Sequence, residues 1–326
     1  MNWKMGIKRD LKVLDFERFS AAAADYEQSL RFISSVTTHH EEGLRYRFYE
    51  GPQPVKDIVI VYHGGGVNLD AGYGILARQL VAESGLSVCL VDMHGHGESK
   101  GIKGHLPDPR LLWQNVDMLI TALKRSHPQA QYHLLGHSSG AGMLINYFTC
   151  HKPAYRITSL ILLAPELGPF AKGVHRKIAT VPFARVTRWP FILNALTGGK
   201  LFGNYVAVKL NIPGSVDNDV KNLVRKYSVN MANALTPRSP AKQLSTLPFP
   251  TLMLVADKDE LFEPKAMEEF AKKYGNHYLS FKLLKDSHHL DCLFNSSFQI
   301  GEFIKHVVKN LGPLAGGPKP LPKISG

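Results

Sequence analysis

The sequence predicts an α/β fold built on a mainly parallel sheet that helices cover on both faces. Short apolar runs rich in β-branched residues alternate with helical patterns from residue 57 onward. One of these runs, 131–135, is followed at once by a glycine-flanked serine and then by a helical pattern. The chain has 326 residues, of which 44% are hydrophobic, and this is enough to bury a large core.

The predicted elements alternate in order along the chain. Expected strands cover 57–62, 86–92, 131–135, 157–164, 251–256 and 278–284. Expected helices cover 16–32, 69–83, 109–125, 141–148, 264–274 and 298–310. Most of these strands are apolar and rich in β-branched residues, which is typical of strands buried on both faces. Pro109 stands at the start of its helix, where a missing N–H costs little.

The chain divides into segments of different character. Residues 1–42 form an N-terminal extension with one helical stretch, and residues 43–311 carry the main domain. Within that domain, 166–247 has no clear strand–helix rhythm and is too long for a bare loop, so we expect an inserted cap. Residues 312–326 are rich in Pro and Gly, which predicts a disordered tail.

Charge and cysteine content limit the function classes. The net charge of +12 favours an anionic membrane surface or an acidic substrate over nucleic acid, because no nucleic-acid-binding motif is present. No apolar run is long enough to span a membrane, and no secretory signal is seen at the N-terminus. Cys89, Cys150 and Cys292 are an odd number without metal spacing, which predicts mostly buried, reduced thiols. We expect a cytoplasmic protein that is peripheral at a membrane if its basic surface binds lipid.

The pentapeptide Gly-His-Ser-Ser-Gly at 136–140 is the most informative motif. It fits the G-x-S-x-G nucleophile elbow, in which a serine sits on a sharp strand-to-helix turn. Glycines flank the serine because neighbouring backbone crowds such a turn. Ser138 is therefore the candidate nucleophile; the alternative is a Gly/Ser turn without chemistry.

A serine hydroxyl needs a base, and the base needs an orienting carboxylate. For an elbow serine these follow in the order acid, then histidine. The run 257–260 supplies three carboxylates after a late strand, and we choose Asp259 over Asp257, with Glu260 facing away. His288 and His289 follow the last strand, and only one of two adjacent loop residues is expected to reach Ser138. We choose His289.

Negative charge on the reaction intermediate needs hydrogen-bond donors. The backbone N–H of Ser139 begins a helix and is suited to this role. The glycine-rich loop 63–66 follows the first expected strand, and the Gly65 N–H is our second donor. Three histidines, His94, His96 and His105, lie near the same edge without a zinc signature. We therefore expect no metal and no cofactor.

These motifs together resemble the monoacylglycerol lipase and lysophospholipase group of serine α/β-hydrolases, which carry a serine aminopeptidase S33-type domain. The resemblance rests on 63–66 with 72–77, on 92–99, which fits D-x-x-G-H-G-x-S, on 136–140, and on the 30-position separation of Asp259 and His289. It covers about residues 45–310. Two departures are 286–288, which replaces a glycine-containing pair before the histidine, and Ser139, where the family often has Met.

The resemblance implies an α/β-hydrolase fold with an inserted cap, and a carboxylic-ester hydrolase acting through an acyl-enzyme on a monoacylglycerol or a lysophospholipid. A peptidase, a thioesterase or a small-ester esterase would use the same residues. A non-catalytic binding module of the same fold is a further alternative, although the serine, base and glycine loop are all present. The cap sequence shows no match from which a substrate could be carried over.

The expected cap is strongly basic. Between residues 170 and 227 two aspartates oppose ten basic residues, namely Lys172, Arg176, Lys177, Arg185, Arg188, Lys200, Lys209, Lys221, Arg225 and Lys226. Large apolar residues, among them Trp189 and Phe202, lie between them. This mixture suits contact with anionic lipid. The alternative is a cap whose apolar side chains line the pocket while its charges face water.

Overall fold

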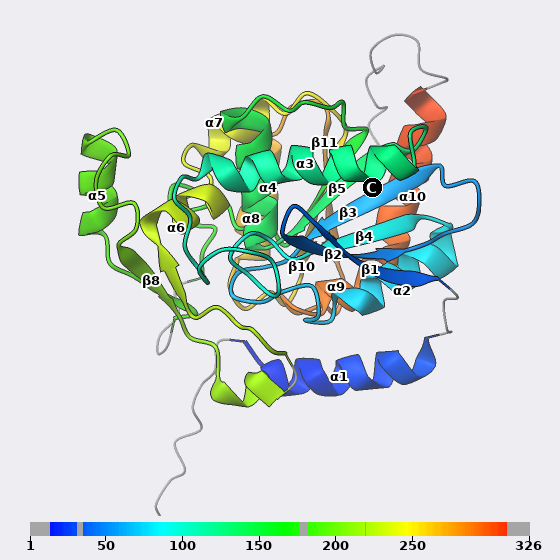
Figure 1. The fold of residues 1–326 in the computed structure, drawn as a ribbon, viewed down its shortest axis with the longest axis horizontal. Helices are drawn as coiled ribbons and strands as arrows, with labels where there is room; N and C mark the ends of the chain where they lie inside the picture. Colours follow the sequence, from blue (N-terminus) through cyan, green and yellow to red (C-terminus); the bar gives the residue numbers. More distant parts are fainter. Residues whose placement is uncertain (1–13, 31–34, 177–181, 219, 312–326) are drawn as a thin grey trace, which may run out of the picture.

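An eight-stranded sheet forms the centre of the protein (Figure 1). The structure, a computed structural model, describes residues 14–30, 35–176, 182–218 and 220–311. The strand order is β1-β2-β4-β3-β5-β6-β10-β11. All neighbouring pairs from β4 to β11 are parallel, whereas β2 runs antiparallel to β1 and to β4. The mainly parallel sheet predicted from the sequence is therefore confirmed.

The six predicted strands form with small shifts at their ends. The sheet consists of β1 (Val36–Glu41), β2 (Leu44–Tyr49), β3 (Asp57–Tyr62), β4 (Ser87–Val91), β5 (Gln131–His137), β6 (Ser159–Leu163), β10 (Thr251–Ala256) and β11 (Leu279–Leu284). Most side chains of the central strands are apolar, and they pack into two cores on opposite faces of the sheet. In β3, Ile58 and Ile60 enter one core, whereas Val59 and Val61 enter the other.

Helices cover both faces of the sheet. One core includes residues of α3 (Arg110–Ser126), α4 (Ser139–Cys150), α7 (Pro240–Ser245) and α8 (Pro264–Tyr274). The other core includes residues of α1 (Phe16–Ser29), α2 (Tyr73–Ser84), α9 (Cys292–Asn295) and α10 (Ser297–Leu311). Figure 1 shows α1 running along one edge of the molecule.

The β1–β2 hairpin was not predicted from the sequence. Its first strand, Val-Thr-Thr-His-His-Glu, is polar and mostly exposed, so it lacks the apolar pattern of the other strands. The turn is made by Glu42 and Gly43, both with positive φ (47° and 85°). The boundary expected between residues 42 and 43 lies in this turn, and β1 joins the central sheet.

The segment 166–247 contains a second, antiparallel sheet. It has the order β7-β8-β9 and consists of β7 (Ala184–Val186), β8 (Val206–Leu210) and β9 (Lys226–Ser228). The segment also contains α5 (Trp189–Leu196), the short 3-10 helix η1 (Gly214–Asn218) and α6 (Val229–Leu235). In Figure 1, α5 projects from the end of the molecule.

Three further predictions from the sequence concern the termini, the cysteines and membrane-spanning helices. The expected disordered tail, 312–326, lies outside the described residues, as do residues 1–13 of the N-terminal extension. Cys89 and Cys292 are buried free thiols, whereas Cys150 is exposed. None of the helices in the described ranges combines the length and apolar content needed to cross a membrane.

A buried carboxylate organises the loops at the carboxyl edge of the sheet. The Asp92 side chain is completely buried just after β4. Its Oδ1 accepts a hydrogen bond from the Leu69 N–H (2.9 Å), and its Oδ2 accepts one from the Glu98 N–H (2.8 Å). Arg45 Nη1 supplies the opposite charge at 3.2 Å from Oδ2. The loop after β3 and the loop after β4 are thereby held to one group.

This ion pair generates a stability prediction. Arg45→Met should lower the free energy of unfolding by about 3 kcal/mol, because it leaves the Asp92 charge buried without its partner. Urea denaturation followed by circular dichroism measures the loss. As the control, Arg110→Met removes a pair with Asp108 at the surface and should leave the midpoint unchanged. Equal midpoints for both variants would contradict a structural role for the Arg45–Asp92 pair.

Candidate active site

Ser138 occupies a strained turn between β5 and α4. Its backbone has φ 53° and ψ −116°, a conformation that residues other than glycine rarely adopt. The turn is tight because its flanking glycines touch other backbone. A Cβ at Gly136 would lie 2.4 Å from the Ala141 nitrogen, and one at Gly140 would lie 2.3 Å from the Tyr62 oxygen. The two glycines are therefore sterically required by the elbow.

The structure brings Ser138, His289 and Asp259 together. Ser138 Oγ lies 3.1 Å from His289 Nε2, and His289 Nδ1 lies 2.8 Å from Asp259 Oδ2. All three side chains are buried. The order along this hydrogen-bonded chain is the one in which a histidine takes a proton from the serine while the carboxylate orients the imidazole.

Asp259 is held by its own loop. Its Oδ1 accepts hydrogen bonds from the backbone N–H groups of Leu261 (2.8 Å) and Phe262 (2.9 Å). Burial raises the pKa of Asp259, but the charge and hydrogen bond of His289 and these two donors outweigh it. The pKa therefore lies below the ordinary aspartate value, and the carboxylate is ionised when it faces the imidazole.

The competing acidic and basic residues point elsewhere. Asp257 Oδ1 accepts a hydrogen bond from the Ser287 N–H (3.1 Å). Glu260 Oε1 lies 2.8 Å from His288 Nδ1, while its Oε2 accepts the His289 N–H at 2.9 Å. Glu260 therefore positions the loop that carries both histidines, and His288 faces Glu260.

Two opposing effects act on the pKa of His289. Complete burial favours the neutral imidazole and lowers the pKa. The charge of Asp259 and its hydrogen bond to Nδ1 favour the imidazolium and outweigh burial, so the pKa is raised above 6.5. The raised pKa makes the neutral imidazole a stronger base for proton abstraction. This neutral form is lost by protonation as pH falls through the raised pKa.

Two tyrosines hold the glycine-rich loop beside the elbow. The Gly64 N–H donates to Tyr73 Oη (2.7 Å), and the Gly66 N–H donates to Tyr227 Oη (2.5 Å). Within the described residues the Gly65 N–H between them has no acceptor. Gly65 is also partly exposed, whereas its two neighbours are buried. This leaves one donor of the loop available to a ligand.

The second predicted donor lies against this loop. A Cβ on Gly65 would lie 2.9 Å from Ser139 Oγ, so the loop and the first turn of α4 are in contact. The Ser139 N–H lies in that first turn, where backbone N–H groups have no acceptor within the helix. The two predicted donors thus lie on segments that contact one another beside Ser138.

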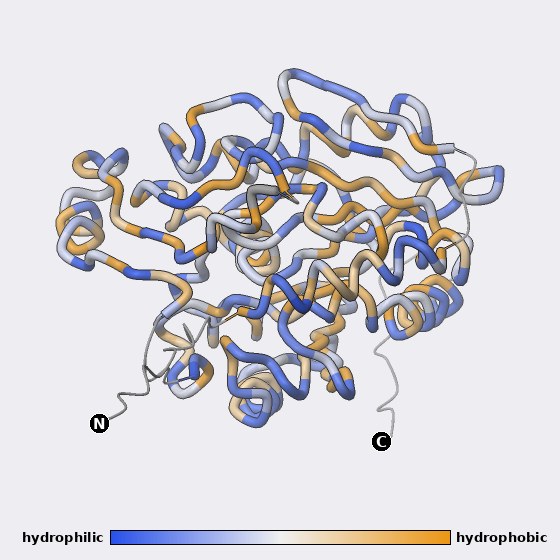
Figure 2. Tube along the Cα trace, turned by 90° about the horizontal axis from the view of Figure 1, so that it is seen from below, coloured by the Kyte–Doolittle hydropathy of each residue, from blue (hydrophilic) through white to orange (hydrophobic). Residues whose placement is uncertain are grey.

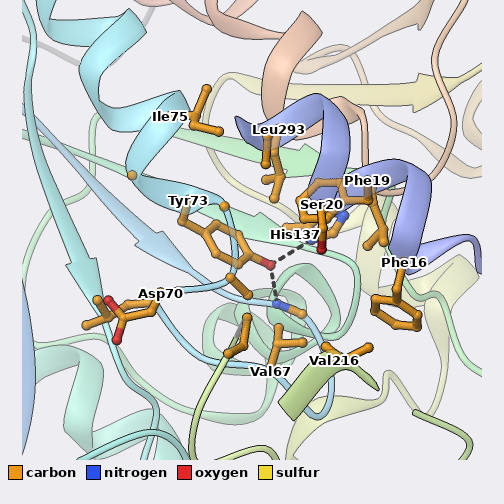
Figure 3. Close-up of a pocket in the computed structure, with 18 of the residues that line it drawn as sticks. Phe16, Phe19, Ser20, Val67, Asp70, Tyr73, Ile75, His137, Val216 and Leu293 are labelled. Carbon is orange, nitrogen blue, oxygen red and sulfur yellow. Dashed lines mark hydrogen bonds between the residues drawn. The ribbon is translucent and has the colours of Figure 1, made fainter. Parts of the chain in front are cut away.

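Sequence reasoning missed the hydrogen-bonded relay behind the loop. Tyr73 Oη lies 2.8 Å from His137 Nδ1 (Figure 3). His137 Nε2 lies 3.3 Å from the His289 carbonyl oxygen. Burial lowers the pKa of His137 to about 3, so its ring is neutral. Because a neutral ring has one donor, Tyr73 donates to Nδ1, and Nε2–H donates to the carbonyl. The relay links the glycine loop to the loop of His289.

Tyr227 was also missed, and no sequence signal identifies it. It belongs to β9 in the segment 166–247, and it lies 161 positions from Gly66, whose N–H it accepts. Its hydroxyl also lies 2.8 Å from His96 Nε2, so it joins the motif at 92–99 to the glycine loop. In the part of the chain that the structure describes, no three His, Cys, Asp or Glu side chains cluster as a metal site would require.

Ser138 and His289 line a cavity of about 680 Å³. Figure 3 shows other residues of its wall, among them Phe16, Tyr73 and Leu293. Most of its wall is apolar; Leu69, Leu290 and Leu293 are examples. The volume falls in the range typical of pockets for small organic ligands. The arrangement presents a serine nucleophile, its base and backbone donors to a largely apolar binding site.

Comparison with known proteins identifies the family. The model of the family described as "Serine aminopeptidase, S33" matches residues 53–293. Mouse monoglyceride lipase is 22% identical over 75% of this chain and 78% of its own length. An uncharacterized abhydrolase domain-containing protein of Dictyostelium discoideum is 23% identical over 85% of this chain, which spans only 28% of that protein.

Solved structures show the same fold. A soluble variant of monoglyceride lipase from Saccharomyces cerevisiae, in complex with a substrate analog, superposes with a TM-score of 0.62. The match covers 85% of this chain and 96% of that one, at 14% identity.

An elbow serine at the edge of a mainly parallel sheet, hydrogen-bonded to a histidine that is in turn hydrogen-bonded to a carboxylate, defines the class of α/β-hydrolases. Within that class, this chain belongs to the serine aminopeptidase S33 family. The α/β-hydrolase fold and the resemblance to monoacylglycerol lipases, both predicted from the motifs, are confirmed.

The electrostatics of His289 can be tested without a substrate. NMR titration of the imidazole should give a midpoint above 6.5 in the wild type, because the Asp259 charge outweighs burial. Asp259→Asn should move the midpoint downward, since burial then dominates. Asp257→Asn is the matched control and should leave the midpoint in place. A midpoint that Asp259→Asn does not lower would contradict this assignment of the raised pKa.

Proposed function

We propose that this protein hydrolyses carboxylic esters of lipid-like monoacyl substrates, such as a monoacylglycerol or a lysophospholipid, through an acyl-enzyme. The observation that carries the proposal is the continuous hydrogen-bonded chain from Ser138 through His289 to Asp259 at the opening of an apolar cavity. The names of the relatives support it, since the mouse protein and the yeast structure are both monoglyceride lipases.

In the proposed reaction Ser138 Oγ attacks the ester carbonyl while His289 Nε2 takes its proton. The bond from carbonyl carbon to the leaving alcohol then breaks, and His289 returns the proton to that alcohol. Asp259 holds the imidazole and stabilises its charged form. A water molecule, deprotonated in turn by His289, releases the fatty acid and restores Ser138.

Negative charge develops on the carbonyl oxygen during both steps. The N–H groups of Gly65 and Ser139 are the proposed donors to this oxygen. Tyr73 and Tyr227 do not touch the substrate in this scheme; they position the glycine loop by accepting hydrogen bonds on either side of Gly65. The donors are fixed before the substrate arrives, so little reorganisation is needed in the transition state.

The nucleophile is tested by substitution. Ser138→Ala should preserve folding and reduce ester turnover by ~10³-fold or more, because the covalent route is lost. A fluorophosphonate probe should label the wild type and spare the variant, as mass spectrometry of the labelled peptide would show. A variant that is still labelled would place the nucleophile elsewhere, with Ser139 the nearest candidate.

The neighbouring histidine provides a matched control for this test. His289→Ala should abolish labelling, whereas His288→Ala should retain most activity because its side chain faces Glu260. Asp259→Asn should reduce turnover more than Asp257→Asn.

A panel of substrates separates the alternative activities. Parallel rates on p-nitrophenyl esters, glycerol esters and phospholipid esters distinguish a lipid esterase from a small-ester esterase. An amide and a thioester in the same panel test the peptidase and thioesterase alternatives.

We also propose that the segment 166–247 is a cap that contacts an anionic membrane surface. Its projecting part exposes large apolar side chains. The hydrophobic residues of this part colour the backbone tube orange at the left of Figure 2. These are Trp189, Ile192, Leu193, Leu196, Leu201, Phe202 and Tyr205. Leu196 is 77% exposed, which is typical of a surface that meets an apolar partner.

Basic residues next to these side chains support an anionic partner. In the register of the small sheet, Arg185 of β7 lies opposite Lys209 of β8, and Lys209 lies opposite Lys226 of β9. Residues directly opposite one another share a face of a sheet, and like charges placed so destabilise it. All three are exposed. An anionic lipid surface would relieve this repulsion while the apolar side chains enter the interface.

Membrane contact predicts salt-sensitive binding. Arg185→Glu with Arg188→Glu and Trp189→Ala should reduce sedimentation with anionic vesicles, since each basic residue near the surface contributes about 1 kcal/mol. Turnover of a short ester should change little. Lys265→Glu with Lys282→Glu makes the same charge change at exposed positions elsewhere and serves as the control. Equal, salt-insensitive binding to neutral and anionic vesicles would contradict the electrostatic part, because the Debye length is only ~8 Å at physiological ionic strength.

A further inference from the structure

The N-terminal helix α1 forms one wall of the cavity that opens onto Ser138. It lies outside the residues that match the family model, which begin at residue 53. Its wall-forming residues follow helical spacing along a single face. They are Phe16, Phe19, Ser20, Ala23, Ala24 and Glu27. At a rise of 1.5 Å per residue, this face runs for about 16 Å along the cavity.

Specific contacts fix α1 against the catalytic loops. Arg18 Nη1 lies 2.7 Å from Asp291 Oδ2, and the same oxygen accepts the His288 N–H at 3.3 Å. Phe19 stacks on Phe294 of α9 with ring centroids 4.9 Å apart. The helix is thus attached to the chain segment that immediately follows His289.

The face of α1 changes character along its length. At its N-terminal end Phe16 packs with Ile212 and Val216 of the inserted segment. Ile212 also touches the glycine-rich loop, since a Cβ on Gly66 would lie 2.5 Å from Ile212 Cδ1. The aromatic end of α1 is therefore the end nearer the reaction centre. At the other end, Glu27 forms an ion pair with Arg78 of α2.

Between these ends the wall is made of the small side chains Ser20, Ala23 and Ala24. Small residues here leave room for a ligand between α1 and the body of the domain. Two other charged residues line the cavity, and they form an ion pair: Arg47 Nη2 lies 2.9 Å from Asp70 Oδ1. Every charged side chain that lines the cavity is therefore paired within the protein, so this space suits an uncharged chain rather than an anionic group.

We infer that α1 is the acyl-chain wall of the substrate site: the carbon chain of a fatty ester lies along this face of α1, and Ala23 and Ala24 set how long a chain is accepted. The inference rests on the proposed ester hydrolysis at Ser138. In this arrangement the aromatic rings of Phe16 and Phe19 lie beside the carbonyl end of the chain, and the Glu27–Arg78 pair marks its far end.

The test is a shift in chain-length preference. Ala23→Leu fills the space beside α1, and kcat/KM for p-nitrophenyl palmitate should fall by ~10-fold or more relative to p-nitrophenyl acetate, because even small groups decide fit in an apolar pocket. Ala21→Leu is the matched control: it makes the same change on the same helix at an exposed position that does not line the cavity. Ala24→Leu, at an exposed lining position, replaces Ala23→Leu if the latter fails to fold.

A binding measurement separates this inference from the proposed function. A polyene fatty acid whose fluorescence rises in apolar surroundings is titrated into Ser138→Ala, alone and combined with each leucine variant. Weaker binding with Ala23→Leu than with Ala21→Leu supports the acyl-chain wall even if the wild type hydrolyses none of the esters, an outcome that would refute only the proposed function. Equal chain-length profiles and equal binding for the two leucine variants would overturn the inference.

Discussion

The positive-φ turn at Ser138 is the constraint on which the rest of the site depends. An L residue is held there only because surrounding backbone leaves no other path between β5 and α4. Gly136 and Gly140 allow that close approach, since any side chain would collide with Ala141 or Tyr62. Because α4 begins at the next residue, the serine is followed directly by the unpaired N–H groups of a first helical turn.

The glycine-rich loop meets the elbow from β3, the strand beside β5, and hydrogen bonds hold it there. Its two outer N–H groups are used by Tyr73 and Tyr227, which come from α2 and from the inserted segment. The same Tyr73 continues through His137 to the carbonyl of His289. One hydrogen-bonded network therefore spans the donors, the elbow and the base, and the neutral His137 transmits it without adding charge next to the imidazole.

Two segments outside the regular strand–helix alternation shape the cavity. The segment 166–247 supplies Phe183, Val216 and Val220, and α1 supplies a complete face. They meet where Phe16 packs on Ile212. In the proposed scheme the core fold provides the chemistry, while these two segments decide which ester reaches it and from what surface.

The sequence by itself determined the elements that local patterns control. Mostly apolar strands, the elbow glycines and the order of serine, acid and histidine predicted the fold and singled out Ser138, Asp259 and His289, which the structure links by hydrogen bonds. The polar strand β1 carried no such pattern and was missed. The sequence favoured His289 over His288, but only the tertiary structure shows the contacts that separate them: His288 faces Glu260, whereas His289 faces Ser138. The tertiary structure alone revealed Tyr73, Tyr227 and the α1 wall, since contacts between residues distant in the chain depend on packing that no local spacing encodes.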